Sequence, residues 1–186
     1  MGILVLAVGL AAATVLAATP LSFFRDGPPA AVTGGFGEDS CYACHWDALN
    51  DGRGELRLAG LPDRFEPGAS YPLQVTLTRP GMEVAGFQLS ARFAHDGEQA
   101  GDLAPGEGEG ERVSVVTQGE TQYIQHRLPG IFLTGPDSAS WRIVWTAPVG
   151  GGRVQFHAAA VAGDDDESQI GDFVYTIEKE SRAKEP

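Results

Sequence analysis

The sequence predicts an all-β protein: an antiparallel, Greek-key-like β-sandwich of about eight strands, preceded by an apolar N-terminal helix and a cysteine-containing loop. Three observations predict this fold class. From residue 55 onward, apolar and polar residues alternate in short runs. Gly, Pro and Asp separate these runs, and no amphipathic helical period interrupts them. This pattern is typical of a sandwich of antiparallel strands.

Each predicted strand is a run of alternating residues. The runs are 56–61, 73–77, 87–93, 113–117, 123–128, 141–146, 154–161 and 173–177. Bulky side chains of one parity predict the inward faces of three of them, namely Phe87, Leu89 and Phe93, then Trp141, Ile143 and Trp145, then Val154, Phe156 and Ala158. Residues 104–111 are predicted to form an acidic hairpin loop, and residues 179–186 a charged tail that frays.

The first 24 residues carry no charged side chain, and residues 3–18 are almost entirely aliphatic. Two export segments fit this composition. One is a signal peptide that is cleaved after Ala17 and Ala18. The other, which we favour, is an uncleaved membrane anchor. Residues 25–40 follow as a linker rich in Gly and Pro, so we expect a domain in the periplasm or on the cell surface, tethered through its N-terminus.

The charge of the chain limits its partners. Thirteen Lys and Arg residues against 25 Asp and Glu residues give a formal net charge of −12. No basic stripe could neutralise phosphates, so nucleic acid is excluded as a partner. The sequence also contains no nucleophile triad and no phosphate-binding glycine loop. We therefore identify no small-molecule substrate and do not expect an enzyme.

The only two cysteines, Cys41 and Cys44, lie in one pentapeptide that ends at His45. C-x-x-C-H is the attachment signature of a c-type haem. Each thiol can bond one vinyl group, and a neutral imidazole is a good axial ligand for iron. We therefore expect one covalent haem c, attached within residues 41–54 and ligated by His45. Three alternatives remain: a disulfide or thiol redox pair, a zinc site, and a chance adjacency of His45.

The second axial ligand is less defined. His126 is our first choice, because it shares the parity of Ile124 and Leu128 on an apolar face. A histidine held in the core by a hydrogen bond fits that position equally well. Met82 and His95 are alternatives in loops, whereas the parity of His157 predicts exposure to solvent.

Three further features have both a structural and a functional interpretation. Trp141 and Trp145 are expected to fill the sandwich interior without any cofactor. Trp46 is expected to pack either on a porphyrin or on the first strand. The acidic run 164–167 suggests calcium, but its spacing is not that of an EF-hand, and a solvated turn is the commoner explanation.

The order of several motifs resembles bacterial Reeler-like domains of the choice-of-anchor V group, over roughly residues 34–178. A glycine-rich lead runs into the cysteine motif. The motifs that follow are Gly60–Tyr71, Gly86–Leu89, Tyr123–His126, Trp141–Pro148 and Gly171–Asp172. The resemblance implies a β-sandwich at residues 55–178, carried at the cell envelope. It does not imply an enzyme, because fold alone does not supply function.

These features together predict a monohaem c-type cytochrome. It would pass single electrons between envelope redox proteins, or serve as an accessory subunit of a respiratory complex. The alternative is a haem-free adhesion or interaction module in which Cys41 and Cys44 form a structural disulfide.

Overall fold

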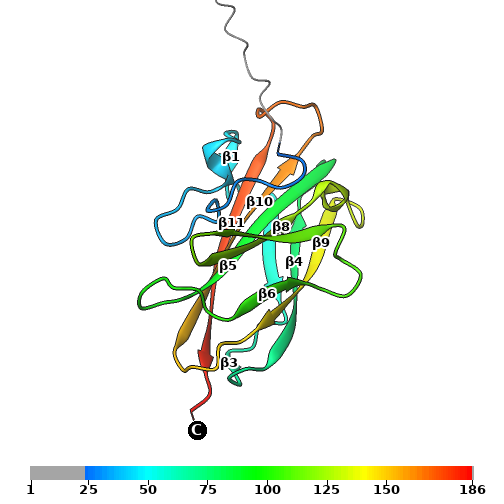
Figure 1. Ribbon diagram of the computed structural model, residues 1–186. Helices are drawn as coiled ribbons and strands as arrows, with labels where there is room; N and C mark the ends of the chain where they lie inside the picture. Colours follow the sequence, from blue (N-terminus) through cyan, green and yellow to red (C-terminus); the bar gives the residue numbers. More distant parts are fainter. Residues whose placement is uncertain (1–23, 186) are drawn as a thin grey trace, which may run out of the picture.

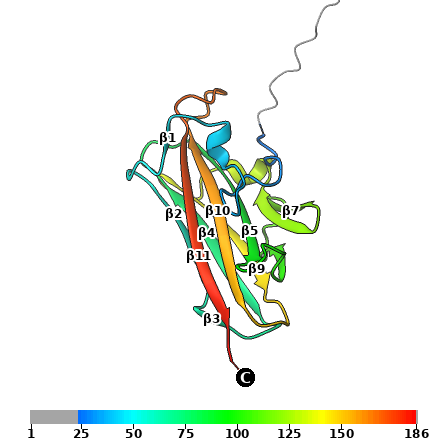
Figure 2. The same ribbon diagram turned by 90° about the vertical axis from the view of Figure 1, so that its left-hand side faces the viewer.

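A computed structural model describes residues 24–185, which form two packed β-sheets (Figures 1 and 2). The larger sheet has the order β1 (Ala48–Leu49), β11 (Phe173–Ala183), β10 (Arg153–Gly163), β5 (Val84–Phe93), β8 (Thr121–His126) and β7 (Val113–Gln118), with β3 (Arg64–Phe65) beside β11. The smaller sheet has the order β2 (Glu55–Ala59), β4 (Ser70–Thr78), β9 (Ser138–Thr146) and β6 (Asp102–Pro105). Two 3₁₀ turns, η1 (Cys41–Ala43) and η2 (Leu128–Ile131), complete the described elements.

The core lies between the two sheets and contains the side chains that the alternation predicts. The Phe87 and Trp141 rings lie 4.5 Å apart between centroids, and the Phe156 and Trp145 rings lie 4.9 Å apart, edge to face. Both indole N–H groups are satisfied in the interior: Trp141 donates to the carbonyl of Gly130 and Trp145 to that of Ala100. Buried indoles need such acceptors. The prediction that these two tryptophans are core residues is confirmed.

The all-β prediction is confirmed, with eleven strands in place of about eight. The antiparallel prediction is wrong for the two-residue strands β1 and β3, which both pair parallel with β11. Each of the eight predicted runs overlaps one of the eight strands that have five or more residues. The three additional strands, β1, β3 and β6, have only two to four residues and are too short to show an alternation. Strand β6 includes Ala104 and Pro105, the first two residues of the predicted acidic loop. No α-helix is present among residues 24–185.

The prediction of a frayed tail at residues 179–186 is wrong for most of that segment. Strand β11 continues to Ala183, and its residues pair with β10 as far as Arg182 opposite Arg153. Ser181 is buried and donates a hydrogen bond to the carbonyl of Pro62. Because pairing with β10 supplies hydrogen bonds to this backbone, the charged side chains can remain exposed while the strand continues.

Residues 25–40, predicted as a linker, pack against the outer face of the larger sheet. Gln88 of β5 binds this segment twice: its Oε1 accepts from the Val32 N–H and its Nε2 donates to the Pro29 carbonyl, both at 2.9 Å. Gln88 is fully buried beneath the segment, and Thr33 is fully buried within it. The low hydrophobicity of these residues therefore does not make them a solvated linker, since backbone groups fix them in place.

The predicted N-terminal helix and anchor lie outside the described residues, apart from Phe24. Within residues 24–185, no helix is long and apolar enough to cross a bilayer. The described chain begins at the end of the sandwich that carries η1 and the loop between β10 and β11, and the C-terminus lies at the opposite end (Figures 1 and 2).

Candidate functional site

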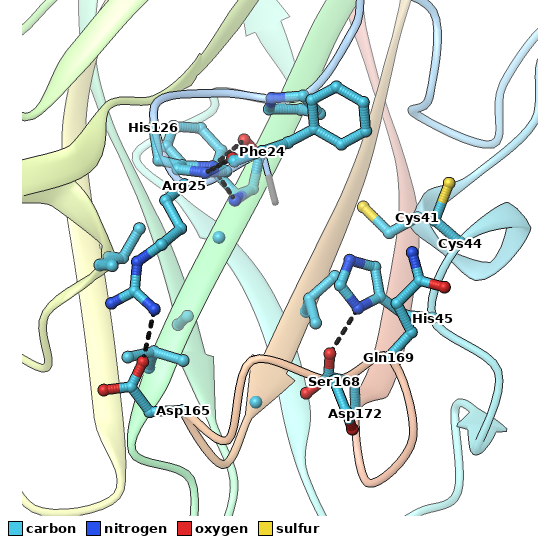
Figure 3. Close-up of a pocket in the computed structure, with 18 of the residues that line it drawn as sticks. Phe24, Arg25, Cys41, Cys44, His45, His126, Asp165, Ser168, Gln169 and Asp172 are labelled. Atoms are coloured by element: carbon cyan, nitrogen blue, oxygen red, sulfur yellow. Dashed lines mark hydrogen bonds and ion pairs between the residues drawn. The ribbon is translucent and has the colours of Figure 1, made fainter. Parts of the chain in front are cut away.

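A pocket lies on the outer face of the larger sheet, at the end where the described chain begins. It encloses about 160 Å³ between the segment 24–32, η1, the ends of β5 and β10, and the loop 164–172. The walls are largely apolar and include Phe24, Pro28, Val32, Val84, Ile131 and Val161. Cys41, Cys44, His45 and His126 also line it, so the structure brings together four residues that the sequence singled out (Figure 3).

The turn η1 places the cysteine motif at one edge of this pocket. Ser40 caps the turn by accepting from the Tyr42 N–H, and the N–H groups of Cys44 and His45 both donate to the carbonyl of Cys41. Both cysteines are free thiols. Although Cys41 retains some exposed surface, burial raises the pKa of its thiol to about 12. A thiol that stays protonated at neutral pH is a poor nucleophile, which disfavours Cys41 as the attacking thiol of a redox pair.

His45 is held by a carboxylate that the sequence analysis did not assign to the site. Nδ1–H of His45 donates to Oδ2 of Asp172 at 2.5 Å, and the Asp172 side chain is only 8% exposed. Among the described residues, no hydrogen bond involves Nε2 of His45. Figure 3 shows this nitrogen turned toward the middle of the pocket. A carboxylate that binds one ring nitrogen fixes the tautomer in which the other can ligate a metal.

His126 lies on the opposite side of the pocket from His45 (Figure 3). Its Nδ1 accepts from the Phe87 N–H at 3.0 Å, and its Nε2 donates to the Phe24 carbonyl at 3.2 Å. Burial lowers the pKa of His126, so the imidazole is neutral. We considered His126 either as an iron ligand or as a histidine held by a hydrogen bond. The structure shows the hydrogen bonds, and the same side chain also lines the pocket.

The parity argument that selected His126 is only partly correct. Ile124 faces the core as expected, but Leu128 is exposed in η2. The imidazole of His126 instead lies over Gly86 on the outer face of the sheet, where the β5–β8 pairing has ended. The absence of a side chain at Gly86 leaves room for it.

The other candidate ligands lie away from the pocket. Met82 is buried in the sandwich core. The His95 side chain is 68% exposed in the turn after β5 and pairs with Asp96. His157, predicted to be exposed, is half-buried because the segment 33–38 covers it and the Phe36 ring packs edge-on at 5.1 Å between centroids.

The acidic run 164–167 forms part of the pocket wall as a series of turns. Oδ1 of Asp164 accepts from the Asp166 N–H, Oδ1 of Asp166 accepts from the Ser168 N–H, and Asp165 pairs with Arg25 at 2.6 Å across the pocket mouth. No group of three His, Cys, Asp or Glu side chains within residues 24–185 is arranged to hold a metal ion. The geometry therefore gives no support to the calcium and zinc interpretations.

Trp46 is 55% exposed, and its indole N–H donates to the Ala43 carbonyl. It is not among the residues that line the pocket. With the half-exposed Tyr42, it leaves an aromatic surface beside the cysteine motif.

No family model matches the chain, and no curated protein matches it. Among solved structures it is similar to the human F-spondin reeler domain, with 23% identity and a TM-score of 0.47 over 71% of this chain and 89% of that one. A second fragment of that domain gives 21% identity and a TM-score of 0.48, over 75% and 97%. A cohesin module of a Clostridium perfringens family 33 glycoside hydrolase is 11% identical, with a TM-score of 0.45 over 72% of this chain and 97% of that one. These likenesses concern the β-sandwich and carry no argument about function.

Proposed function

We propose that this chain is an exported protein that carries one covalently attached haem c and passes single electrons between partners at the cell envelope. One observation carries the proposal. His45, held through Nδ1 by Asp172, presents Nε2 to an apolar pocket whose edge bears the thiols of Cys41 and Cys44. The spacing of these three residues is the haem-attachment signature, and here they lie together at the edge of a pocket.

The residues of the pocket fit a haem in their chemistry. Each thiol can add its S–H across one vinyl group, which forms a thioether without loss of an atom and without an oxidant. A neutral imidazole nitrogen suits iron, and apolar walls suit a porphyrin. When bound, haem iron supplies one-electron chemistry between its ferric and ferrous states, so the chain would need no acid, base or nucleophile. Because burial raises the pKa of the Cys41 thiol, attachment is expected while the pocket is open and this thiol is exposed to solvent.

The pocket must open to admit a porphyrin. Its volume of about 160 Å³ is below the roughly 300–1,000 Å³ of pockets that enclose organic ligands. Two contacts hold Phe24 and Arg25, at the start of the segment 24–32, over the pocket. The Arg25–Asp165 ion pair is more than one-third exposed on both sides and contributes about 0–1 kcal/mol. The hydrogen bond from His126 to the Phe24 carbonyl contributes about 0.5–1.5 kcal/mol. Neither contact is strong enough to prevent Phe24 and Arg25 from moving, whereas Asp26, Pro29 and Val32 are bound to Leu128 and Gln88.

The same movement would make His126 available to hold the iron together with His45. Loss of the Phe24 carbonyl leaves Nε2 of His126 without its acceptor. Nδ1 lies 3.2 Å from the Phe87 carbonyl and can donate to it in the other tautomer, which places the lone pair on Nε2. His126 is therefore our choice for the second residue that would hold the iron, ahead of Met82 and His95.

The partners would be envelope redox proteins or a respiratory complex. The uncharged residues 1–24 would tether the chain to a membrane, and they lead directly into the pocket wall at Phe24. Haem at this pocket would therefore lie close to the bilayer. The exposed rings of Tyr42 and Trp46 beside the attachment site offer a surface for electron transfer, and the charge of −12 favours a basic partner.

An absorption spectrum tests this proposal. The full chain is expressed for export with and without a cytochrome c maturation system, and a Cys41→Ser/Cys44→Ser double variant serves as the control. We expect a Soret band that requires maturation, resists extraction with acid acetone and is absent from the control. If the wild-type chain made with maturation lacks this band, the proposal is wrong. Oxidised thiols in that chain would then favour the interaction module with a Cys41–Cys44 disulfide.

A further inference from the structure

We propose that Asp172 is a positioning residue that fixes the proton of His45 on Nδ1 and thereby prepares Nε2 as the iron ligand. This inference rests on the proposed haem function. It assigns a role to a residue that lies 127 positions from His45 in the sequence and is joined to it only by the fold.

The structure contains space that fits the Asp172 carboxylate. A Cβ atom at Gly163, the last residue of β10, would lie 2.6 Å from Oδ1 of Asp172. Contacts that short are essentially never found, so a side chain at Gly163 would displace the carboxylate from this position. Gly171 precedes Asp172 with φ of +92°, a conformation that glycine adopts without strain. The ends of β10 and β11 therefore place this carboxylate directly beside η1.

The burial of Asp172 requires a partner. A carboxylate that is 8% exposed is costly unless it is paired and hydrogen-bonded. Within residues 24–185, the only ion pair that involves Asp172 is the one with Nδ1 of His45. Neighbouring carboxylates are used differently, because Asp164 accepts from a backbone N–H of its own loop and Asp165 pairs with Arg25. The contact with His45 is thus specific to Asp172 and is not a general property of the acidic loop.

The consequence of this contact is electronic as well as geometric. A carboxylate on the far nitrogen of a ligating imidazole fixes its orientation and increases its basicity, and such partners alter metal affinity about 10- to 100-fold. A more basic ligand stabilises ferric iron over ferrous iron. Removing the charge of Asp172 should therefore make reduction easier. If the 10- to 100-fold loss of affinity falls on the ferric state, the midpoint potential rises by about 60–120 mV, since a tenfold change in affinity corresponds to about 59 mV for one electron.

The first test needs no haem. Histidine ¹⁵N chemical shifts of the haem-free chain, at a pH where His45 is neutral, report which ring nitrogen carries the proton. We expect Nδ1–H in the wild type and in Asp164→Asn, a control that removes a carboxylate from the same pocket wall without touching His45. Asp172→Ala should move His45 toward the Nε2–H form. Equal shifts for His45 in the wild type and in a folded Asp172→Ala chain would overturn the proposal.

The second test uses the haem-loaded protein, after intact mass has shown one haem per chain. Asp172→Asn keeps an acceptor for Nδ1–H but removes the charge, so it guards against failure of the alanine variant to fold. We expect its midpoint potential to lie above that of the wild type by the stated amount and well above that of Asp164→Asn. Equal potentials for the two asparagine variants would overturn the proposal. A chain without haem would instead overturn the proposed function, and the ¹⁵N measurement would still decide the role of Asp172.

Discussion

The imidazole of His126 occupies the space in which a side chain at Gly86 would lie. A Cβ atom at Gly86 would be 2.6 Å from Cε1 and 2.9 Å from Nδ1 of the ring. The ring is held there by Phe87 on one side and by Phe24 on the other. This relationship between β5 and the end of β8 places a histidine in the pocket wall opposite the cysteine motif.

Gly86→Ala should destabilise the haem-free chain, because the added methyl group collides with a ring that is hydrogen-bonded at both nitrogens. Overpacking of this kind costs about 1–3 kcal/mol in the free energy of unfolding. Urea denaturation measures the loss. Gly110→Ala is the matched control, since a Cβ at Gly110 meets nothing within 4 Å, and it should change stability by less than about 0.5 kcal/mol. Equal stability of the two variants would contradict the packing described here.

Acidification should destabilise the haem-free chain through His126. Burial lowers its folded pKa below 6.5, so below that pH the unfolded chain binds a proton that the folded chain does not. The stability from this group is complete above pH 6.5 and is lost as the pH falls through the folded pKa. The loss is at most about 1.4 kcal/mol per pH unit. The charge of the nearby Asp26 raises the pKa of His126 and so reduces this loss of stability. Burial lowers the pKa of His157, which adds to the loss.

The comparison that isolates His126 is urea denaturation of the wild type and His126→Gln at several pH values between 5 and 7.5. The variant should lose less stability on acidification than the wild type. If both chains lose the same amount, proton binding in the unfolded state at His126 does not contribute to the pH dependence.

Replacement of His126 should alter the coordination of the proposed haem. We expect His126→Ala to change the absorption spectrum from six-coordinate low-spin toward five-coordinate, because no other candidate ligand among the described residues lies in the pocket. His95→Ala should leave the spectrum unchanged, since the His95 side chain is mostly exposed in a distant turn. An unchanged spectrum in a folded His126→Ala chain would reassign His126 to a structural role.

Removal of one attachment thiol should sharply reduce haem retention. Cys44→Ser leaves only Cys41 to form a thioether, so much of the haem should be lost in acid acetone. Tyr42→Phe changes the same pentapeptide without removing a thiol, and it should retain haem as the wild type does. Full retention and a normal spectrum in Cys44→Ser would contradict the two-thioether attachment.

Much of the sandwich could be predicted because alternation reports burial directly. Trp141 and Trp145 share a parity and are both fully buried. Strand β11 was predicted to end too early, because Lys179, Glu180 and Arg182 carry charges. The pairing of their backbone with β10, which no local pattern encodes, overrides that composition.

The site could be predicted only where its residues are adjacent in sequence. The spacing of Cys41, Cys44 and His45 is a local signal, and the structure places all three at the pocket. Asp172 is visible in the sequence only as part of a Gly-Asp motif, and the fold joins it, just before β11, to His45, just after η1. The cover formed by residues 25–40 escaped prediction for a related reason. It is fixed by hydrogen bonds to Gln88, and hydrophobic periodicity does not report those bonds.

The central claim is that haem is bonded to Cys41 and Cys44, and the intact mass of the exported chain tests it most directly. The protein is purified from cells with a cytochrome c maturation system, denatured and weighed. The account predicts the mass of the mature polypeptide plus that of one haem. A mass equal to that of the polypeptide alone would contradict it.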